Sequence, residues 1–174
     1  MPTLPAIYSI GHSNLAIEAF IERLHQNGVE AIVDVRSAPY SQFNPRFNRE
    51  DLVRSLDRAG IAYAFAGEYL GGRPKDPACY KNGVVPEGKA DYLNLVDYKA
   101  VARLPSFLNG LARLLEIAGE SRTAMMCSEE DPDHCHRHHL IAQSLLDRDV
   151  AVLHIRGNGE IEEAQREAEQ LSLL

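Results

Sequence analysis

TAMMCSEEDPDHCHRHHLIAQSLL, residues 123–146, has the pattern of one strand–loop–helix unit. The apolar run Thr123–Cys127 predicts a strand, and the apolar spacing of Leu140–Leu146 predicts a helix. The stretch Met125–Leu140 within this unit holds two of the three cysteines and four of the seven histidines of the chain. Open α/β sheets bind their ligands at such connections, outside the carboxyl ends of strands, so this stretch predicts both a fold and a site.

The same alternation of strand and helix continues on either side of this unit. Four more strands are expected from apolar and β-branched runs at 6–10, 31–35, 61–65 and 150–155. Helical patterns occur at 15–27, 48–59, 91–104, 106–118 and 160–171. They predict a single α/β domain over residues 1–174: a Rossmann-like, doubly wound, mostly parallel five-stranded sheet with helices on both faces. We expect the strand order 3-2-1-4-5, with the switch point between strands one and four.

The composition of the chain narrows its possible functions. Its 174 residues, 45% of them hydrophobic, suffice for one domain with a sizeable core. A net charge of −7 favours a small ligand over duplex nucleic acid. No run approaches the ~18–20 apolar residues that span a bilayer, and the first residues lack a signal-peptide pattern, so no membrane partner is expected. Three cysteines, an odd number, favour reduced thiols in the cytoplasm over a disulfide framework.

The loop after the first predicted strand carries Gly11, His12 and Ser13. Backbone N–H groups at the start of the following helix would suit an anion. His12 is a candidate general acid or base, because imidazole titrates near neutral pH. Packing and hydrogen bonding explain a lone histidine equally well, so this loop alone is weak support for a site.

Polar residues also follow the second and third predicted strands. Asp34 and Arg36 stand at the exit of the second strand, where buried charges require partners. We expect Asn48, Glu68 and Arg73 on the loops of the same sheet edge. The aromatic residues interleaved with these groups are Tyr40, Phe43, Phe47 and Tyr69. Arginine beside aromatic faces suits a nucleotide or a single-stranded nucleic acid end, although packing of the loops explains the aromatic residues equally well.

Cys127, Cys135 and His136 have three interpretations. Thiolate and imidazole are suitable ligands for zinc or iron. The candidates for a fourth ligand are His12, His134, His138 and His139, and we expect the last two on the solvated surface. Cys127 is also a candidate nucleophile, because Arg137 and a helix N-terminus favour a thiolate. The acidic residues of the loop oppose it: Glu129, Glu130, Asp131 and Asp133. In the third interpretation Cys127 simply ends a buried strand.

The middle of the loop has the pattern of a helix start. Asp131 provides an N-cap acid and Pro132 follows at the first helical position. Arg137, one turn further, is unfavourable beside the helix N-terminus. We therefore expect it to meet an anionic ligand or a carboxylate, such as that of Glu68 or Asp34.

Five motifs carry a resemblance to a known family. They are IGHSN at 10–14, VDVRSAP at 33–39, NPRFN at 44–48, GEYLGGRP at 67–74 and the C-x7-C-H-R run from Cys127 to Arg137. In this order they resemble the uncharacterised family catalogued as domain of unknown function 488. The resemblance covers essentially the whole chain. It implies an α/β fold and a shared site, and it leaves the reaction open.

These observations lead first to the hypothesis of an enzyme that binds a small anionic ligand, phosphate-bearing or nucleotide-related, at the carboxyl edge of the sheet. The candidate catalytic groups are His12 and Glu68 as acid and base, and Cys127 or Glu129 as nucleophile or orienting group. The anionic groups of the ligand would be held by Arg36, Arg73 and Arg137. The remaining candidate ligand-binding residues are Gly11, Ser13, Asp34, Asn48, Cys135 and His136.

A second hypothesis is a metal-binding or redox-sensing module. It would use Cys127, Cys135 and His136 with zinc or iron as the cofactor. A third hypothesis, a nucleic-acid-associated accessory protein without chemistry, is disfavoured by the acidic balance of the chain.

Overall fold

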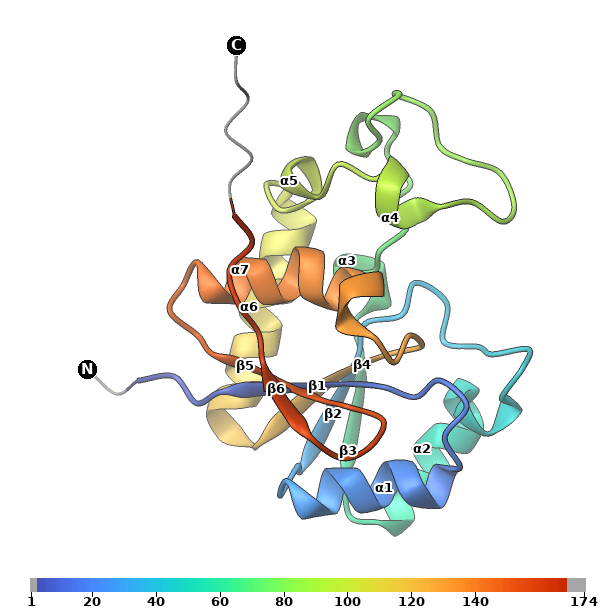
Figure 1. Cartoon of the computed structure of the whole chain (residues 1–174), viewed down its shortest axis with the longest axis vertical. Coiled ribbons are helices and arrows are strands. Elements are labelled where there is room, and N and C mark those ends of the chain that lie inside the picture. Colours follow the sequence, from blue (N-terminus) through green and yellow to red (C-terminus); the bar gives the residue numbers. More distant parts are fainter. Residues whose placement is uncertain (1–2, 169–174) are drawn as a thin grey trace.

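A single six-stranded sheet forms the centre of the molecule (Figure 1). The computed structural model describes residues 3–168. The strands are β1 (Ile7–Gly11), β2 (Ala31–Asp34), β3 (Ala62–Phe65), β4 (Thr123–Cys127), β5 (Val152–Ile155) and β6 (Ile161–Glu163). The first five are parallel, and β6 is antiparallel to β5. The prediction of a mostly parallel α/β sheet is confirmed, with six strands in place of five.

The predicted order of the strands is wrong. The sheet has the order β3-β2-β4-β1-β5-β6, with β4 inserted between β2 and β1. All five residues of β4 are buried, so the middle of the sheet suits this strand, whereas β3 is partly exposed at the edge. The order differs from the Rossmann order 3-2-1-4-5-6, and that part of the prediction is not supported.

The loops after β1 and β4 nevertheless lie side by side, as the sequence predicted. Gly11 is level with Cys127 in the parallel pair. Beyond the strands, the N–H of His12 donates to the carbonyl of Cys127 at 3.0 Å, and the N–H of Ser13 to that of Ser128 at 2.8 Å.

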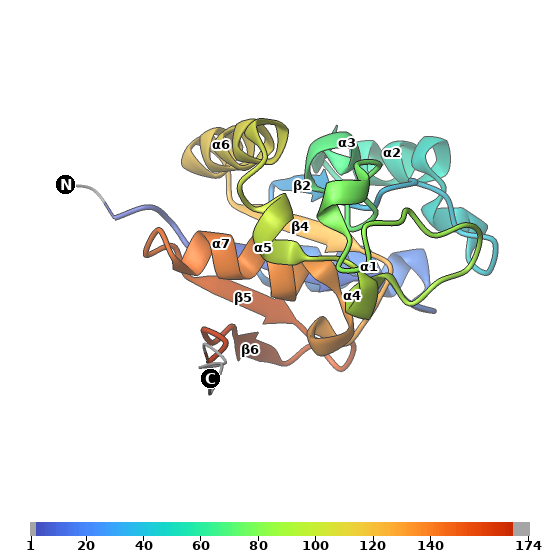
Figure 2. The same cartoon turned by 90° about the horizontal axis from the view of Figure 1, so that it is seen from above.

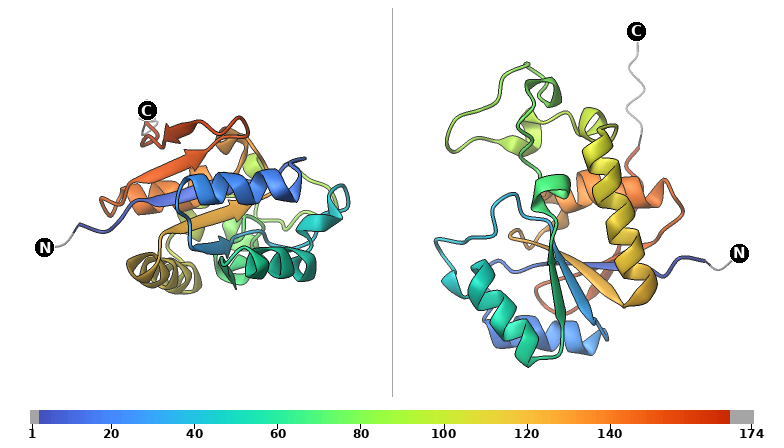
Figure 3. Two further views of the ribbon diagram at one scale, coloured as in Figure 1. Left: turned by 90° about the horizontal axis from the view of Figure 1, so that it is seen from below. Right: turned by 180° about the vertical axis from the view of Figure 1, so that it is seen from behind.

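Helices cover both faces of the sheet, below and above it in Figure 1. The helices are α1 (Ile17–Gln26), α2 (Arg49–Arg58), α3 (Gly67–Leu70), α4 (Tyr92–Leu95), α5 (Tyr98–Val101), α6 (Pro105–Glu120) and α7 (Gln143–Leu146). A π-helical segment, η4 (Arg137–Ala142), runs directly into α7. Figure 2 shows the face under α5, α6 and α7, and the left view of Figure 3 shows the opposite face under α1 and α2. No helix in residues 3–168 has the length and apolar character needed to cross a membrane.

Each face has its own core, because successive strand residues point to opposite sides. Ile32, Ala124 and Met126 pack with α1 and α2. Val33 and Met125 pack with α6, η4 and α7. We call the first side the α1–α2 face and the second the α6–α7 face.

Two predicted helices differ from the structure. The pattern at 91–104 is divided into α4 and α5, because Val96 pairs with Tyr80 in a bridge and the Asp97 carboxylate accepts from the N–H of Ala100 to start α5. The predicted final helix at 160–171 is wrong over its described part. Residues 161–163 form β6 on the open edge of β5, residues 164–168 are not helical, and residues 169–171 lie outside the described range.

Candidate functional site

The alternation of side chains divides the predicted site between the two faces of the sheet. Val35 and Cys127 pack into the core of the α6–α7 face. Asp34 points to the other face, where Tyr63 donates to it at 2.7 Å, and His12 stacks on Phe47, a core residue of that face. Two clusters result in place of the one crevice that the sequence predicted.

Cys127, Cys135 and His136 form the first cluster, which we call the thiol cluster. Cys127 ends β4, and Cys135 and His136 directly precede η4. The three side chains are buried. Nδ1 of His136 lies 3.8 Å from the Sγ atom of each cysteine, and the three ligand atoms lie within 4.8 Å of one another. This part of the predicted site is therefore brought together.

The tautomer of His136 follows from its second ring nitrogen. Nε2 lies 3.0 Å from the carbonyl oxygen of Val35. A carbonyl only accepts, so Nε2 carries the hydrogen, and the neutral imidazole presents the lone pair of Nδ1 to both sulfur atoms. Histidines that ligate metals commonly hold their other N–H in the same way.

The two thiols of the cluster have opposite acidity. Although burial raises the pKa of the Cys135 thiol, the hydrogen bond from Cys127 lowers it well below its usual value. The hydrogen bond to Cys135, together with burial, raises the pKa of Cys127 well above its usual value. Cys135, rather than the predicted Cys127, is therefore the sulfur that favours the thiolate form.

Two residues around the cluster were missed in the sequence. A Cβ atom on Gly72 would lie 2.7 Å from Cγ of His136, so only glycine fits against this imidazole. The sequence carried a signal for Gly72, because this residue belongs to the GEYLGGRP motif at 67–74. Tyr98 of α5 is the second: burial and then the charges of Cys135 and Cys127 raise its pKa. No pattern in the sequence indicated Tyr98, because it lies on α5, far along the chain from Cys127 and Cys135.

Arg137 has internal partners. Its side chain is fully buried, and Nε donates to the hydroxyl of Ser9 at 3.1 Å. The two Nη atoms donate to the carbonyls of Glu129 and Glu130. Among residues 3–168 no carboxylate pairs with it, so the expected partners Glu68 and Asp34 are wrong. Arg137 holds the loop after β4 against Gly11, where a Cβ atom would overlap the Glu129 carbonyl.

His12, Asp34 and Arg36 form the second cluster, which we call the His12 cluster. Nε and Nη2 of Arg36 donate to the two carboxylate oxygens of Asp34 at 2.9 and 2.8 Å. The ring of His12 stacks on Phe47 with centroids 4.4 Å apart. Burial lowers the pKa of His12 to about 4, so the imidazole is neutral at physiological pH.

Two buried polar atoms of the His12 cluster have no partner within residues 3–168: Nε2 of His12 and Nη1 of Arg36. Nδ1 of His12 faces the carbonyl of Ser13 at 2.9 Å and must carry the hydrogen, so Nε2 is an acceptor. Nη1 of Arg36 is a donor. Buried polar atoms are seldom left unpaired, so Nε2 of His12 calls for a donor and Nη1 of Arg36 for an acceptor.

The remaining predicted residues lie apart from these clusters. Glu68, Arg73 and Glu129 are exposed. The guanidinium of Arg73 lies over the ring of Tyr92, 4.6 Å from its centroid. The amide of Asn48 accepts from the N–H of Ser41 at 2.8 Å. The expected helix start at Asp131 is a single 3-10 turn, Pro132–His134, and the longer helical segment begins only at Arg137.

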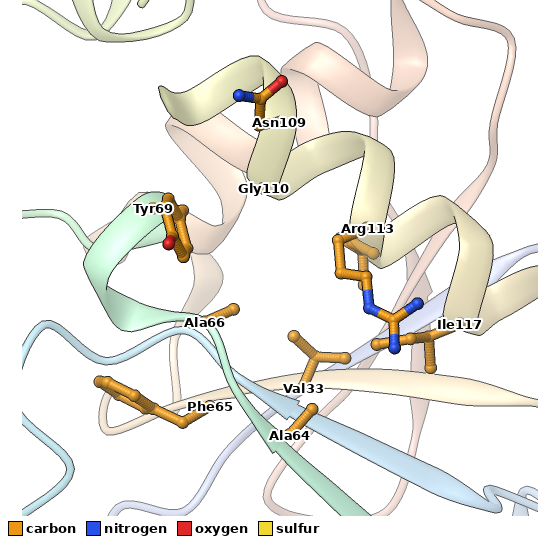
Figure 4. Close-up of a pocket in the computed structure, with 10 residues that line it drawn as sticks. Val33, Ala64, Phe65, Ala66, Tyr69, Asn109, Gly110, Arg113 and Ile117 are labelled. Atoms are coloured by element: carbon orange, nitrogen blue, oxygen red, sulfur yellow. The ribbon is translucent and has the colours of Figure 1, made fainter. Parts of the chain in front are cut away.

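One groove of the molecule contains Tyr69, one of the aromatic residues predicted for the site, but no candidate catalytic, metal-binding or anion-binding residue. It is a groove of about 350 Å³ between β3, α3 and α6. Figure 4 shows Ala64 and Ala66 on one side and Arg113 of α6 on the other. Its lining is mainly apolar, and its one charged side chain is Arg113.

Fold and cluster together define an α/β protein with a buried cysteine–cysteine–histidine cluster at the carboxyl edge of a mostly parallel sheet. The chain belongs to the family described as Domain of unknown function DUF488, which matches residues 16–144. The resemblance stated from the motifs is confirmed. The matched range contains the whole thiol cluster but begins after His12. Neither the curated proteins nor the solved structures gave a match.

Proposed function

We propose that the thiol cluster is a metal centre in which Cys127, Cys135 and His136 bind a divalent ion, zinc in the first place. The observation that carries the proposal is the orientation of His136. Its Nε2–H is held by the carbonyl of Val35, which leaves the lone pair of Nδ1 directed at two sulfur atoms at equal distance.

The spacing of the ligand atoms supports an ion at their centre. Zinc binds sulfur at ~2.3 Å and imidazole nitrogen at ~2.0–2.1 Å, so a tetrahedral site separates the two atoms by ~3.6 Å. The observed separations are 3.8 Å for both cysteines. A shift of a few tenths of an ångström would complete the site, and the Cys135 thiolate supplies negative charge.

Three protein ligands leave a fourth position for water or a substrate atom, as in catalytic zinc sites. Tyr98 is the neighbouring polar residue that the charges of both sulfur atoms influence. A metal ion here would act as a Lewis acid or activate a bound water molecule.

Elemental analysis of protein purified without a histidine tag tests the proposal. We expect about one equivalent of zinc or iron to disappear in Cys127→Ser and in Cys135→Ser. Cys79→Ser is the matched control and should keep that equivalent, because Cys79 is buried outside the cluster. Equal metal content in all four proteins would contradict the proposal. A metal-free protein with a reversible Cys127–Cys135 disulfide would favour a redox function instead.

A second candidate function is a small-ligand site in the His12 cluster, as in the hypothesis of a phosphate-bearing or nucleotide-related ligand. The unpaired Nε2 of His12 and Nη1 of Arg36 favour it. Because one atom accepts and the other donates, they suit a protonated phosphate oxygen or a ribose hydroxyl better than a fully ionised anion.

Calorimetric titration with inorganic phosphate and with a nucleoside monophosphate tests this second function. We expect binding to the native protein and at least about tenfold weaker binding to His12→Phe, which keeps an aromatic ring against Phe47. His25→Gln changes an exposed histidine and should bind as the native protein does. Absence of binding, or equal affinity of His12→Phe, would remove this function.

A further inference from the structure

A second group of metal-ligating side chains lies beyond the thiol cluster, on the same π-helical segment. His138 and His139 of η4 face Glu167, which follows β6 in the C-terminal part of the chain. The two imidazoles and the carboxylate each offer one atom, and these atoms lie within 4.8 Å of one another. We propose that His138, His139 and Glu167 form a second site for a divalent transition-metal ion.

His139 gives the first argument. Nε2 of His139 donates to the carbonyl of Asp133 at 2.7 Å, because a carbonyl only accepts. The lone pair of the neutral ring is then on Nδ1, the atom that directly contacts Oε1 of Glu167. Two groups that both offer electron pairs face one another, so the contact requires a shared proton or, once the two side chains move apart, a metal ion bound to both.

His138 gives the second argument. Its Nε2 lies 3.8 Å from the same carboxylate oxygen, too far for a direct hydrogen bond. A proton shared by His139 and Glu167 would not involve Nε2 of His138, whereas a metal ion would use all three groups. Two imidazoles and one carboxylate are a known zinc ligand set with an open fourth position.

A buried chain of hydrogen bonds holds the Nδ1 side of the His138 ring, the side away from Glu167. Its Nδ1 lies 3.1 Å from Nε2 of His154, and Nδ1 of His154 lies 2.5 Å from the hydroxyl of Ser9. Arg137 also donates to this hydroxyl. Metal binding requires the direction His138 to His154 to Ser9, in which each ring donates inward and the lone pair of His138 Nε2 points towards Glu167. This gives the ring the support that outer hydrogen bonds give to metal ligands.

The segment that carries Glu167 is also held before any ion binds. The side chain of Gln143 donates to the carbonyl of Gln165 at 3.1 Å and accepts from the N–H of Glu167 at 2.9 Å. The charges that face His138 are those of Glu167, Asp133 and Glu162 on one side and of His139 on the other. An excess of carboxylates favours a cation at this position.

The site predicts a specific role for the ion. It would tie the segment after β6 to η4, on the helical segment that begins beside Cys135 and His136. The metal would therefore strengthen the attachment of residues 164–168 to η4. This inference does not depend on whether the thiol cluster binds metal.

Zinc titration of the metal-free, tag-free full-length protein in a calorimeter tests the inference. We expect two binding events. Glu167→Gln and His139→Asn should each weaken one event by at least about tenfold. That event should remain in Cys135→Ser, which would remove the other. Glu163→Gln removes an exposed carboxylate of β6 and should keep both events.

Cobalt distinguishes the two sites in the same proteins, because only cobalt bound to thiolate gives a strong sulfur-to-metal absorption band. The event lost in Glu167→Gln should be the one that lacks this band. The inference is overturned if Glu167→Gln retains every binding event of the native protein, or if the event that it loses carries the thiolate band. Loss of binding in Cys135→Ser alone would support the thiol cluster and exclude the second site.

Discussion

The thiol cluster and the His12 cluster lie at the same edge of the sheet, but their polar atoms are satisfied in different ways. In the thiol cluster, one imidazole nitrogen faces two sulfur atoms, and these three possible metal-ligand atoms lie close together. In the His12 cluster, Arg36 is neutralised by Asp34, and two buried atoms have no partner in the described range 3–168. Residues gathered at one edge by their loops therefore make one site only if their side chains also share a face of the sheet.

The largest expected effect comes from breaking the ion pair of the His12 cluster. Asp34→Ala would leave the Arg36 guanidinium buried without a counter-charge and would also remove the acceptor of Tyr63. Loss of one partner from a buried pair costs about 3–5 kcal/mol. Urea denaturation should show this loss in the free energy of unfolding.

Asp51→Ala is the control for that prediction. Asp51 pairs with Arg54 on the exposed surface of α2, where an ion pair contributes at most about 1 kcal/mol. Similar losses in the two variants would mean that the Asp34–Arg36 pair behaves as a surface pair. The burial of the Asp34–Arg36 pair would then have no effect on its contribution to stability.

The His12 cluster should also make the protein sensitive to mild acid. The folded pKa of His12 is about 4, below the ordinary value of 6.5, so the unfolded chain binds a proton at pH values where the folded protein does not. Stability is therefore lost as pH falls from about 6.5 to about 4. The loss is at most about 3.5 kcal/mol, because each pKa unit corresponds to about 1.4 kcal/mol.

His12→Gln should flatten this part of the pH dependence in thermal or urea unfolding. The charged groups that face His12 are Arg36 and Asp34, and both stay in place in this variant. His134→Gln removes an exposed imidazole and should leave the curve unchanged. An unchanged slope between pH 6.5 and 4 in His12→Gln would contradict the assignment.

Gly72→Ala should affect the thiol cluster and leave the His12 cluster intact. The new Cβ would press on the His136 ring and move Nδ1 away from the two sulfur atoms. Overpacking of this kind costs about 1–3 kcal/mol. We expect lower stability together with loss of the metal proposed for the thiol cluster, measured by elemental analysis.

Gly119→Ala provides the matched control. Gly119 lies in α6, and no atom lies within 4 Å of the position that a Cβ would take there, so alanine should stabilise the helix by about 0.5–1 kcal/mol. If Gly72→Ala were neutral in both stability and metal content, the close packing of Gly72 on His136 would have no importance for the cluster.

Local patterns were sufficient to predict most elements of the fold but not their order. Apolar runs located five strands, and helical spacing located α6. The position of β4 between β2 and β1 depends on which strand buries both faces most completely, and several runs had similar composition. The final helix was wrong because part of this acidic, helix-favouring sequence forms β6, which pairs with the open edge of β5.

The site was predictable as a set of residues but not as an arrangement. Sequence spacing brought Cys127, Cys135 and His136 together because one strand and one helical segment carry them all. It gave a wrong environment for His138, expected on the surface but buried against His154, a residue of β5. Contacts between distant segments, such as this pair, leave no pattern in the sequence of either segment.

The smallest expected effect concerns Glu130, in the loop between Cys127 at the end of β4 and Cys135. Hydrogen bonds from Arg156 and from the N–H of Gly157 lower the pKa of Glu130 to about 2, below the ordinary value of 4.5. A depressed carboxyl pKa contributes stability above pH 4.5 that is lost as pH falls towards 2. Because the side chain of Glu130 is one-third exposed, we expect only about 1 kcal/mol.

Glu130→Gln should therefore be less stable than the native protein at pH 7, and the two should become equal near pH 2 in urea titrations. Glu162→Gln removes a more exposed partner of Arg156 and should have a smaller effect. The window from pH 4.5 to 2 lies below the His12 window, so the two loops can be followed separately in one acid titration. If Glu130→Gln instead changed the slope between pH 6.5 and 4, the two loops would be coupled, and the separation of the clusters by the sheet would not hold.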